Sequence, residues 1–269
     1  MSSKAPIGVF DSGVGGLTVV KEIMHQIPGE TIIYFGDTAR LPYGSKSKET
    51  VTTYTRQIVR FLMAKDVKAI VIACNTASAF ALETVKAEFD VPIIGVVKPG
   101  AAVAADTTKN GMIGVIGTEG TIRSGIYNEF LSLTNPQVKV YGKACPLFVP
   151  LVEEGLIDDP ITMEMARRYI GELIEYDIDT LVLGCTHYPL LRKTIRKIVG
   201  DQIALVNPAY ETAKSLKQVL VEHALENDEV LKSDHKFFVS DGAEKFKRFA
   251  NSILPCEVVE TKDVNIENY

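Results

Sequence analysis

Short runs of apolar residues alternate along most of the chain with longer segments in which apolar positions recur at a helical period. Residues 69–73 and 180–184 are examples of the first kind, and residues 47–65 are an example of the second. Apolar runs of strand length separated by helix-length segments are typical of parallel α/β architecture. The pattern therefore predicts an α/β protein with mainly parallel sheets.

The boundaries of the predicted elements follow from this alternation and from Gly and Pro positions. Predicted strands cover residues 7–10, 31–35, 69–73, 91–97, 112–116, 138–141, 180–184, 203–206 and 236–240, with a last short strand near the end. Predicted helices run from the turn at 11–16 to about 26, over 47–65, 76–89, 101–108, 122–133, 161–176 and 190–199, from about 213 to 226, and over 243–253. Residues 144–155 are predicted to form an irregular link and residues 227–235 a polar loop.

A faint internal repeat indicates two similar halves. The sequence G-V-F-D-S-G at 8–13 resembles G-V-I-G-T-E-G at 114–120, and Cys185 follows Cys74 at a similar offset. Two such halves related by a pseudo-two-fold axis would place equivalent strand ends at a shared cleft, where ligands tend to bind. The long helix after Tyr210 would return the chain to the first half. We therefore expect three-layer domains at 1–97 plus 208–269 and at 98–207, with the active site in the cleft between them.

Composition narrows the class of protein. The chain has 269 residues and a net charge of −5, which allows two domains and gives no basic footprint for nucleic acid. The N-terminus lacks a leader-like apolar region, and no run of about 18 apolar residues follows, so no membrane segment is expected. The four cysteines lack C-x-x-C spacing, which argues against zinc and a disulfide scaffold. These features predict a soluble cytoplasmic protein with free thiols.

Two of the cysteines stand at predicted strand ends and form the main chemical candidate. Cys74 ends the run I-V-I-A and Cys185 ends the run L-V-L-G, and each precedes a helix-like pattern. A helix N-terminus or a cationic neighbour lowers the pKa of a thiol and favours the reactive thiolate. Two buried structural thiols are the alternative interpretation. Their equivalent positions favour a pair that performs chemistry together.

Other polar residues near these strand ends have two interpretations each. His187 is placed to exchange a proton with Cys185, or else it caps the following helix or satisfies a buried carbonyl. Asp11 is placed to act in the same way beside Cys74, or else it is an N-cap, and Ser12 is a candidate for both binding and capping. Thr118 and Thr121 lie at a strand end of the second half.

The glycine-rich turn at 11–16 and the loop at 36–44 are candidate binding segments. D-S-G-V-G-G matches neither G-x-G-x-x-G nor a P-loop, so backbone binding of a carboxylate is the preferred hypothesis. The loop G-D-T-A-R-L-P-Y-G holds Asp37, Arg40, Tyr43 and Gly44, with an ordinary solvent-exposed loop as the alternative. Of Glu153 and Glu154, one is expected to be buried.

Several motifs together resemble those of the cofactor-independent aspartate/glutamate racemases, and of their bacterial glutamate racemase branch in particular. They are D-S-G-V-G-G-L-T-V (11–19), G-D-T-A-R-L-P-Y-G (36–44), A-C-N-T-A (73–77), G-T-E-G-T (117–121), A-C-P-L-F-V-P-L-V-E (144–153) and L-G-C-T-H-Y-P-L-L (183–191). The resemblance implies an isomerase with two pseudo-symmetric α/β domains that interconverts L- and D-glutamate for peptidoglycan synthesis. It also implies no pyridoxal phosphate or other cofactor, no metal, and a homodimer.

The resemblance assigns roles to individual residues. Cys74 and Cys185 would be the acid/base pair, with Asp11 and His187 beside them. Substrate binding would fall to Asp11, Ser12, Pro42, Tyr43, Gly44, Asn75, Thr76, Thr118, Thr121, Thr186 and Glu153. Asp37 and Glu153 match acidic positions near the family site. Lys98 and the Asn207-Pro208 segment depart from the family pattern.

The chemistry expected of the two thiols is a two-base inversion. One cysteine, as thiolate, removes the α-proton, and the other, as thiol, returns a proton to the opposite face. A racemase of aspartate or another amino acid is the nearest alternative. A thiol redox protein and a ligand-binding protein without turnover are alternatives from other classes.

Overall fold

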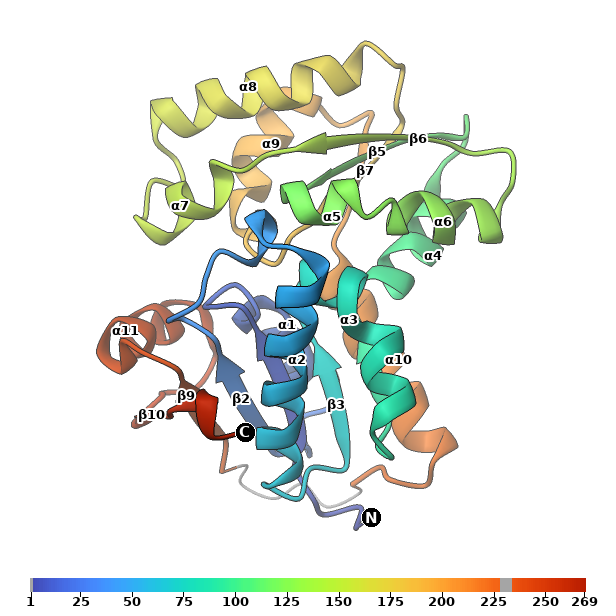
Figure 1. Ribbon diagram of the computed structural model, residues 1–269. Coiled ribbons are helices and arrows are strands. Elements are labelled where there is room, and N and C mark those ends of the chain that lie inside the picture. Colours follow the sequence, from blue (N-terminus) through green and yellow to red (C-terminus); the bar gives the residue numbers. More distant parts are fainter. Residues whose placement is uncertain (1, 228–233) are drawn as a thin grey trace. The chain divides into compact units, whose positions relative to one another are not determined.

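The computed structural model describes residues 2–227 and 234–269, so most of the polar loop predicted at 227–235 lies outside the described residues. The chain divides into two compact units, Met1–Val96 with Ala209–Tyr269, and Val97–Pro208. Each unit contains one sheet whose paired strands are all parallel, with helices packed on it (Figure 1). The predicted α/β class with mainly parallel sheets is confirmed.

The sheet of the first unit has six strands. In spatial order they are β10 (Thr261–Asp263), β9 (Lys236–Val239), β2 (Ile32–Gly36), β1 (Ile7–Asp11), β3 (Ala69–Ile72) and β4 (Ile93–Gly95). Residues alternate between the two faces of a strand, and here both faces are apolar. Ile7 and Val9 of β1 belong to one buried cluster, whereas Phe10 belongs to the other. A sheet that is apolar on both sides requires a helical layer on each.

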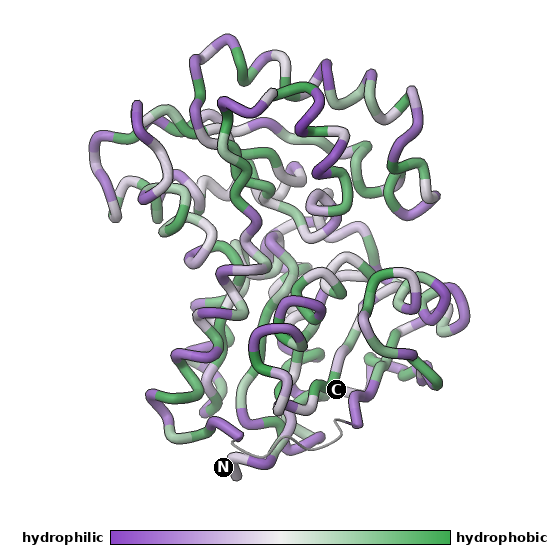
Figure 2. Tube along the Cα trace, turned by 180° about the vertical axis from the view of Figure 1, so that it is seen from behind, coloured by the Kyte–Doolittle hydropathy of each residue, from purple (hydrophilic) through white to green (hydrophobic). Residues whose placement is uncertain are grey.

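The two helical layers of the first unit supply these covers. The cluster around Ile7 and Val9 contains residues of α1 (Leu17–Gln26), α10 (Pro208–Glu222) and α11 (Ala243–Ile253). The cluster around Phe10 contains residues of α2 (Lys48–Met63) and α3 (Asn75–Glu88). The first unit is therefore a three-layer α/β/α structure. Figure 2 shows hydrophobic and hydrophilic positions alternating along the Cα trace.

The second unit is built on a four-stranded sheet in the order β6 (Lys139–Ala144), β5 (Met112–Gly117), β7 (Thr180–Gly184) and β8 (Ala204–Val206). Its helices are α4 (Val97–Thr107), α5 (Glu119–Arg123), α6 (Ile126–Thr134), α7 (Phe148–Glu153), α8 (Pro160–Ile174) and α9 (Arg192–Val199). One buried cluster joins α4 and α6 to Ile113, Val115 and Val182 of the sheet. On the opposite face, Leu173 of α8 and Leu181 pack over Gly114.

The two sheets share one strand order. In the first unit β2, β1, β3 and β4 are neighbours in that order, and in the second unit β6, β5, β7 and β8 follow the same order. Cys74 comes shortly after β3, and Cys185 comes directly after β7. The two cysteines therefore occupy equivalent topological positions, in agreement with the faint repeat in the sequence.

Several predicted boundaries in the second half are wrong for local reasons. The single helix predicted at 122–133 is two helices, α5 and α6, because Gly125 adopts a left-handed conformation with φ 69° between them. The link predicted at 144–155 contains α7. The helix predicted at 101–108 begins already at Val97, because Pro99 lies in its first turn, where no helical N–H bond is lost.

Prolines also explain two other differences from the predicted helices. Pro208 occupies the first position of α10, so this helix begins earlier than the sequence pattern indicated. Pro189 lies in the 3₁₀ turn η2 (Tyr188–Leu191), and α9 begins only after it at Arg192. The strand predicted at 91–97 is shorter, because the chain enters α4 at Val97.

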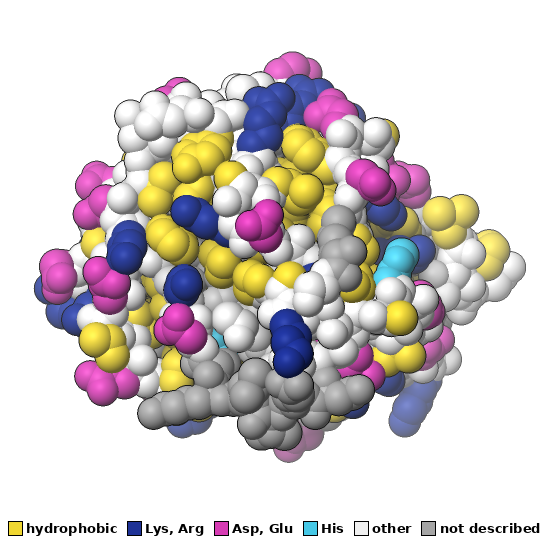
Figure 3. All heavy atoms as spheres, turned by 90° about the horizontal axis from the view of Figure 1, so that it is seen from below, with side chains coloured by type: hydrophobic (Ala, Val, Ile, Leu, Met, Phe, Trp, Pro, Cys, Tyr) yellow, Lys and Arg dark blue, Asp and Glu magenta, His cyan; other side chains and the backbone are white. Residues whose placement is uncertain are grey.

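Two observations concern the length of the helices and the charges on one face of the molecule. In the part of the chain that the structure describes, no helix combines the length and apolar character needed to cross a bilayer. On the face shown in Figure 3, basic and acidic side chains are interspersed with apolar ones, and neither sign of charge dominates.

A buried ion pair ties the start of β3 to the turn before β2. Lys68 is 0% exposed and Glu30 is 3% exposed, and their Nζ and Oε2 atoms are 2.5 Å apart. The backbone N–H of Asn227 donates to Oε1 of Glu30 at 3.0 Å, and Lys68 also donates to the carbonyl of Ser3. The pair therefore joins four segments that are distant in sequence.

Replacement of Lys68 by Met is expected to lower the free energy of unfolding by about 3–5 kcal/mol, because it leaves the buried carboxylate of Glu30 without its cation. Urea unfolding monitored by circular dichroism measures the loss. Lys236→Met is the matched control, since Lys236 faces Asp234 in an exposed pair at 3.7 Å and should cost less than about 1 kcal/mol. Equal losses for the two variants would show that the buried pair is not important.

Candidate active site

Polar side chains gather at the carboxyl ends of the central strands in each unit. The first cluster consists of Asp11, Ser12, Cys74, Asn75, Thr76 and the loop at 37–44. The second cluster consists of Thr118, Thr121, Glu153, Cys185, Thr186 and His187. All the residues predicted from the sequence fall into one cluster or the other. Open α/β sheets bind ligands at this edge.

The sulfur of Cys74 caps a helix. Cys74 is the N-cap of α3, and its Sγ accepts the backbone N–H of Ala77 at 3.4 Å. It also lies 3.8 Å from the hydroxyl oxygen of Ser12. The residue is 5% exposed. The predicted placement at the positive end of a helix is therefore correct for Cys74, and such a position stabilises a thiolate.

Asn75 and Thr76 form the first turn of the same helix. They are 4% and 2% exposed. Backbone N–H groups in the first turn of a helix have no acceptor within the helix, so this turn is suited to hold a carboxylate. The first cluster thus combines a thiol with a group of N–H donors.

The carboxylate of Asp11 holds the glycine-rich turn in place. Its Oδ2 accepts the N–H groups of Gly13 at 3.1 Å and of Gly16 at 3.0 Å. These are two of the backbone donors that the sequence analysis assigned to a ligand carboxylate, so that part of the expectation is wrong. Gly16 must be glycine, since a Cβ there would lie 2.5 Å from Cβ of Asp11.

Tyr34 is a member of the first cluster that the sequence analysis missed. Its hydroxyl donates to the carbonyl of Gly13 at 2.7 Å, and the side chain is fully buried in β2. Burial raises the pKa of Tyr34 well above its usual value, and the nearby charges of Asp11 and Cys74 raise it further. The phenol therefore stays neutral and serves as a fixed donor. A tyrosine in the middle of the apolar run I-I-Y-F was the available signal.

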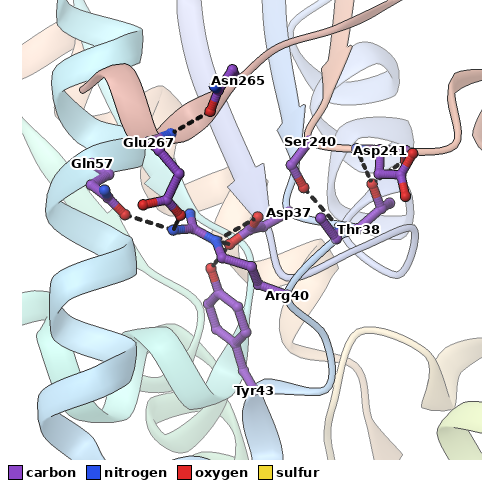
Figure 4. A network of polar contacts seen from close by, with 10 residues as sticks. Asp37, Thr38, Arg40, Tyr43, Gln57, Ser240, Asp241, Asn265 and Glu267 are labelled. Atoms are coloured by element: carbon purple, nitrogen blue, oxygen red, sulfur yellow. Dashed lines mark hydrogen bonds and ion pairs between the residues drawn. The ribbon is translucent and has the colours of Figure 1, made fainter.

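The loop at 37–44 is tightly held, so the alternative of an ordinary solvent loop is wrong (Figure 4). Asp37 is 0% exposed, and its carboxylate accepts from the hydroxyl of Tyr43 and pairs with Nε of Arg40 at 2.8 Å. Tyr43 is 1% exposed, and its pKa is raised by burial and then by Asp37, with a smaller effect from Cys74. The phenol of Tyr43 therefore faces Asp37, and the loop backbone at Gly44 is buried beside it. Pro42 is exposed and follows a cis peptide bond.

In the second cluster, Cys185 follows the strand β7 but does not begin a helix. The backbone N–H of Tyr188 donates to the carbonyl of Cys185 at 3.1 Å, which forms a turn into η2. The expected helix N-terminus at this cysteine is therefore wrong. The sulfur is instead 3.8 Å from Nδ1 of His187, and Cys185 is 6% exposed.

His187 connects this thiol to a carboxylate. Its Nε2 lies 3.0 Å from Oε1 of Glu153, and its other ring nitrogen faces the sulfur of Cys185. The side chain of His187 makes no cap hydrogen bond, so the capping alternative is wrong. Many active sites have the same arrangement, in which a nucleophile or base lies beside a partner that a third group orients. Here the thiol takes the first position, the imidazole the second and the carboxylate the third. Glu153 is the last residue of α7, in the segment predicted to be irregular.

The threonines of the second cluster lie at the ends of adjacent strands. Gly117 of β5 and Gly184 of β7 are partners in the sheet, so Thr118 and Cys185 come directly after paired residues. The Oγ1 of Thr118 accepts the N–H of Thr121 at 3.3 Å and caps α5. Thr121 and Thr186 are 1% and 7% exposed.

Two buried tyrosines beside Cys185 were also missed. Burial raises the pKa of both Tyr127 and Tyr188, and the charge of Cys185 raises each further. The hydroxyl of Tyr188 donates to the carbonyl of Cys145 at 2.9 Å, and its ring packs edge-on against Phe148 of α7. Tyr188 therefore links the cysteine turn to the helix that carries Glu153.

Each cluster can exchange a proton through a thiol that has a polar neighbour within reach. In the first this neighbour is a hydroxyl, and in the second it is an imidazole held by a carboxylate. Among residues 2–227 and 234–269, no three His, Cys, Asp or Glu side chains gather as a metal site would require.

Comparison with known proteins finds racemases similar to this chain. The family model described as Asp/Glu/Hydantoin racemase matches residues 7–216. The glutamate racemase of Geobacter metallireducens is 49% identical over 261 residues, which are 97% of each chain. The crystal structure of the glutamate racemase isoform RacE1 from Bacillus anthracis is similar with a TM-score of 0.94 and 40% identity, over 97% of this chain and 98% of that one. The glutamate racemase of Francisella tularensis in complex with D-glutamate has a TM-score of 0.93 and 38% identity, over 99% and 100%.

A third thiol, Cys145, is buried near the second cluster. It is 0% exposed, and burial raises its pKa far above the usual range. We therefore expect that iodoacetamide at pH 8 does not label Cys145 in the folded protein, because very little thiolate forms there. Peptide mass mapping after alkylation measures this, and the same treatment in urea is the control that should label it. Labelling of Cys145 at similar rates in both states would contradict the structure.

Proposed function

The chain belongs to the Asp/Glu/hydantoin racemase family and is an amino-acid racemase, and we propose that it interconverts L- and D-glutamate by proton transfer between Cys74 and Cys185 at the α-carbon. The two-cysteine mechanism rests on the equivalent positions of the two thiols. Cys74 follows β3 and Cys185 follows β7, and these strands have the same place in the orders β2-β1-β3-β4 and β6-β5-β7-β8. Identity of 49% to a glutamate racemase over 97% of the chain supports glutamate as the substrate.

Inversion of a stereocentre requires a base on one face of the α-carbon and an acid on the other. In the proposed step the thiolate of one cysteine takes the α-proton, and the electron pair of the broken C–H bond moves toward the α-carboxylate. The thiol of the second cysteine then gives its proton to the opposite face, so that it ends as a thiolate. Exchange of the two roles gives the reverse reaction.

The two thiols are assisted by different groups. Cys74 lies at the start of α3 with an N–H donor at 3.4 Å, and both features stabilise negative charge on sulfur. Cys185 has the imidazole of His187, held by Glu153, as a local proton partner. Asp11 supports the first cluster through the glycine turn and Tyr34 through the carbonyl of Gly13.

The carbanion formed in this reaction has to be stabilised without an electron sink such as pyridoxal phosphate, which we do not invoke. Fixed hydrogen-bond donors aimed at the developing charge are the general means. We assign this task to the first turn of α3 with Asn75 and Thr76. The remaining binding residues of the proposal are Ser12, Pro42, Tyr43, Gly44, Thr118, Thr121, Thr186 and Glu153.

The proposal treats the two compact units as two domains acting on one substrate, and it places the enzyme in the cytoplasm as a supplier of D-glutamate for peptidoglycan. It also includes the homodimer implied by the family resemblance, which light scattering of the purified protein tests. Incubation with L-glutamate, D-glutamate and L-aspartate, followed by circular dichroism, decides between glutamate and the alternative substrate aspartate. A redox protein would instead show oxidant-dependent thiol titration and no change in optical rotation.

The two-cysteine mechanism predicts that Cys74→Ser and Cys185→Ser each lower kcat for racemisation by at least about a hundredfold, because a serine hydroxyl is a far weaker acid than a thiol. The circular-dichroism assay in both directions measures the loss. Cys256→Ser is the control, since Cys256 is partly exposed and belongs to neither cluster. Full activity in either of the first two variants would refute the mechanism.

The carboxylate–imidazole contact gives a second prediction. Glu153→Gln removes the charge that orients His187, and it should lower kcat/KM by about 10- to 100-fold, as expected for a charge-assisted hydrogen bond. The loss must be the same for L- and D-glutamate, because enantiomers have equal free energies in water and their interconversion has an equilibrium constant of one. Glu154→Gln, on the exposed neighbour, is the control. An unchanged kcat/KM in Glu153→Gln would remove Glu153 from the mechanism.

A further inference from the structure

Arg40, to which the reaction as proposed assigns no role, lies at the centre of a polar network in the first unit (Figure 4). Its Nε pairs with the carboxylate of Asp37 at 2.8 Å. Its Nη1 donates to the side-chain oxygen of Gln57 in α2 at 2.6 Å. Its guanidinium carbon lies 4.0 Å from the ring centroid of Tyr54. Arg40 therefore connects the substrate loop at 37–44 to the helix behind it.

The same guanidinium reaches the end of the chain. Oε1 of Glu267 is 3.3 Å from Nη1 of Arg40, and Glu267 lies in the 3₁₀ turn η3 (Ile266–Asn268). Residues 264–269, called the C-terminal segment from here on, thus contact a loop that is more than 200 positions away in sequence. This contact is an ion pair in which Nη1 of Arg40 also donates a hydrogen bond, and a cavity of about 300 Å³ lined by both residues adjoins it.

The C-terminal segment is itself firmly attached to α2 and the sheet. Ile266 is 3% exposed within the cluster formed by α2 and α3. The ring of Tyr269 packs edge-on against Phe61 at 5.2 Å, and Arg60 donates to the carbonyl of Tyr269 at 3.1 Å. Oδ1 of Asn265 accepts the N–H of Glu267 at 3.1 Å and caps the turn. These contacts therefore fix the position of Glu267.

A parallel set of contacts fixes the first half of the loop from the end of β9. The N–H of Ala39 donates to the hydroxyl of Ser240 at 2.8 Å, and the N–H of Asp241 donates to the hydroxyl of Thr38 at 3.1 Å. These contacts hold residues 38–39. In the second half of the loop, Tyr43 is held by Asp37, and Asp37 in turn pairs with Arg40.

We propose that Arg40 is a positioning residue for the substrate loop and that the C-terminal segment, through Glu267, holds Arg40 in place. Arg40 neutralises the fully buried carboxylate of Asp37, and Asp37 fixes the phenol of Tyr43 and with it the backbone at Gly44. Loss of this alignment would weaken substrate binding at the first cluster, since small displacements of binding groups have large effects on rate. The inference rests on the proposed function for its kinetic readout.

The test compares Arg40→Lys and Glu267→Gln with the wild-type enzyme. A lysine keeps the charge but loses the planar fork, so KM for glutamate should rise at least about fivefold with a smaller change in kcat. Glu267→Gln should raise KM about two- to fourfold, as expected for an exposed ion pair. In the double variant, KM should exceed that of Arg40→Lys alone by less than about 1.5-fold, because Glu267 acts only through Arg40.

Glu260→Gln is the matched control. Glu260 pairs with Lys262 at 3.3 Å on the same C-terminal part of the chain, so the control breaks an exposed ion pair of the same length that does not touch the loop. Its KM should equal that of the wild type. Unchanged KM in both test variants, or independent effects of Arg40→Lys and Glu267→Gln, would overturn the inference.

A readout that does not depend on activity separates this inference from the proposed function. Trypsin cleavage after Lys46, which follows the loop, should be faster in Arg40→Lys and Glu267→Gln than in the wild type and Glu260→Gln, at equal thermal stability. If the wild type does not racemise glutamate, the proposed function fails, and the cleavage rates still decide whether the C-terminal segment holds the loop. Equal cleavage rates in all four proteins would show that it does not.

Discussion

The carboxyl ends of parallel strands lie at one edge of the sheet, and the residues that follow them no longer pair with neighbouring strands. Each unit of this protein uses that edge for its polar side chains, and each places a cysteine after the same strand of the same order. The apolar faces of the strands are covered by helices, so the buried polar groups of the two clusters lie at these ends, where loops and helix starts supply hydrogen bonds. The location of the two polar clusters is thus a consequence of the fold.

The two clusters satisfy their buried polar groups in different ways. In the first, the glycine turn wraps around the carboxylate of Asp11, and close contacts such as that between Gly16 and Tyr34 leave no space for a side chain. In the second, the imidazole of His187 lies between a carboxylate and a thiol. The first arrangement depends mainly on backbone donors and is therefore rigid. The second depends on side chains from two separate segments, and Tyr188 keeps those segments together.

The sequence alone was sufficient for the features that follow from periodicity and from local motifs. Strand runs such as 180–184 and amphipathic helices such as 47–65 were predicted nearly to the residue. Short helices were not, because α7 depends for its stability on Phe148 packing against Tyr188 and Tyr169, which no local pattern reveals. The sequence could not predict that Asp37 is buried for the same reason. Its partner Arg40 is itself held by Glu267 from the far end of the chain. Distant contacts decide these cases.

The difference between the clusters has a consequence for a reaction whose substrate and product are mirror images. Equal free energies of the two enantiomers constrain only the ratio of kcat/KM in the two directions, which must be one. They place no constraint on kcat or KM taken separately. In the proposed mechanism the two proton carriers have different neighbours, since Cys74 lies at a helix start and Cys185 lies beside an imidazole. Two sheets of the same topology with chemically unequal partners would then give unequal KM values for L- and D-glutamate, compensated by unequal kcat values.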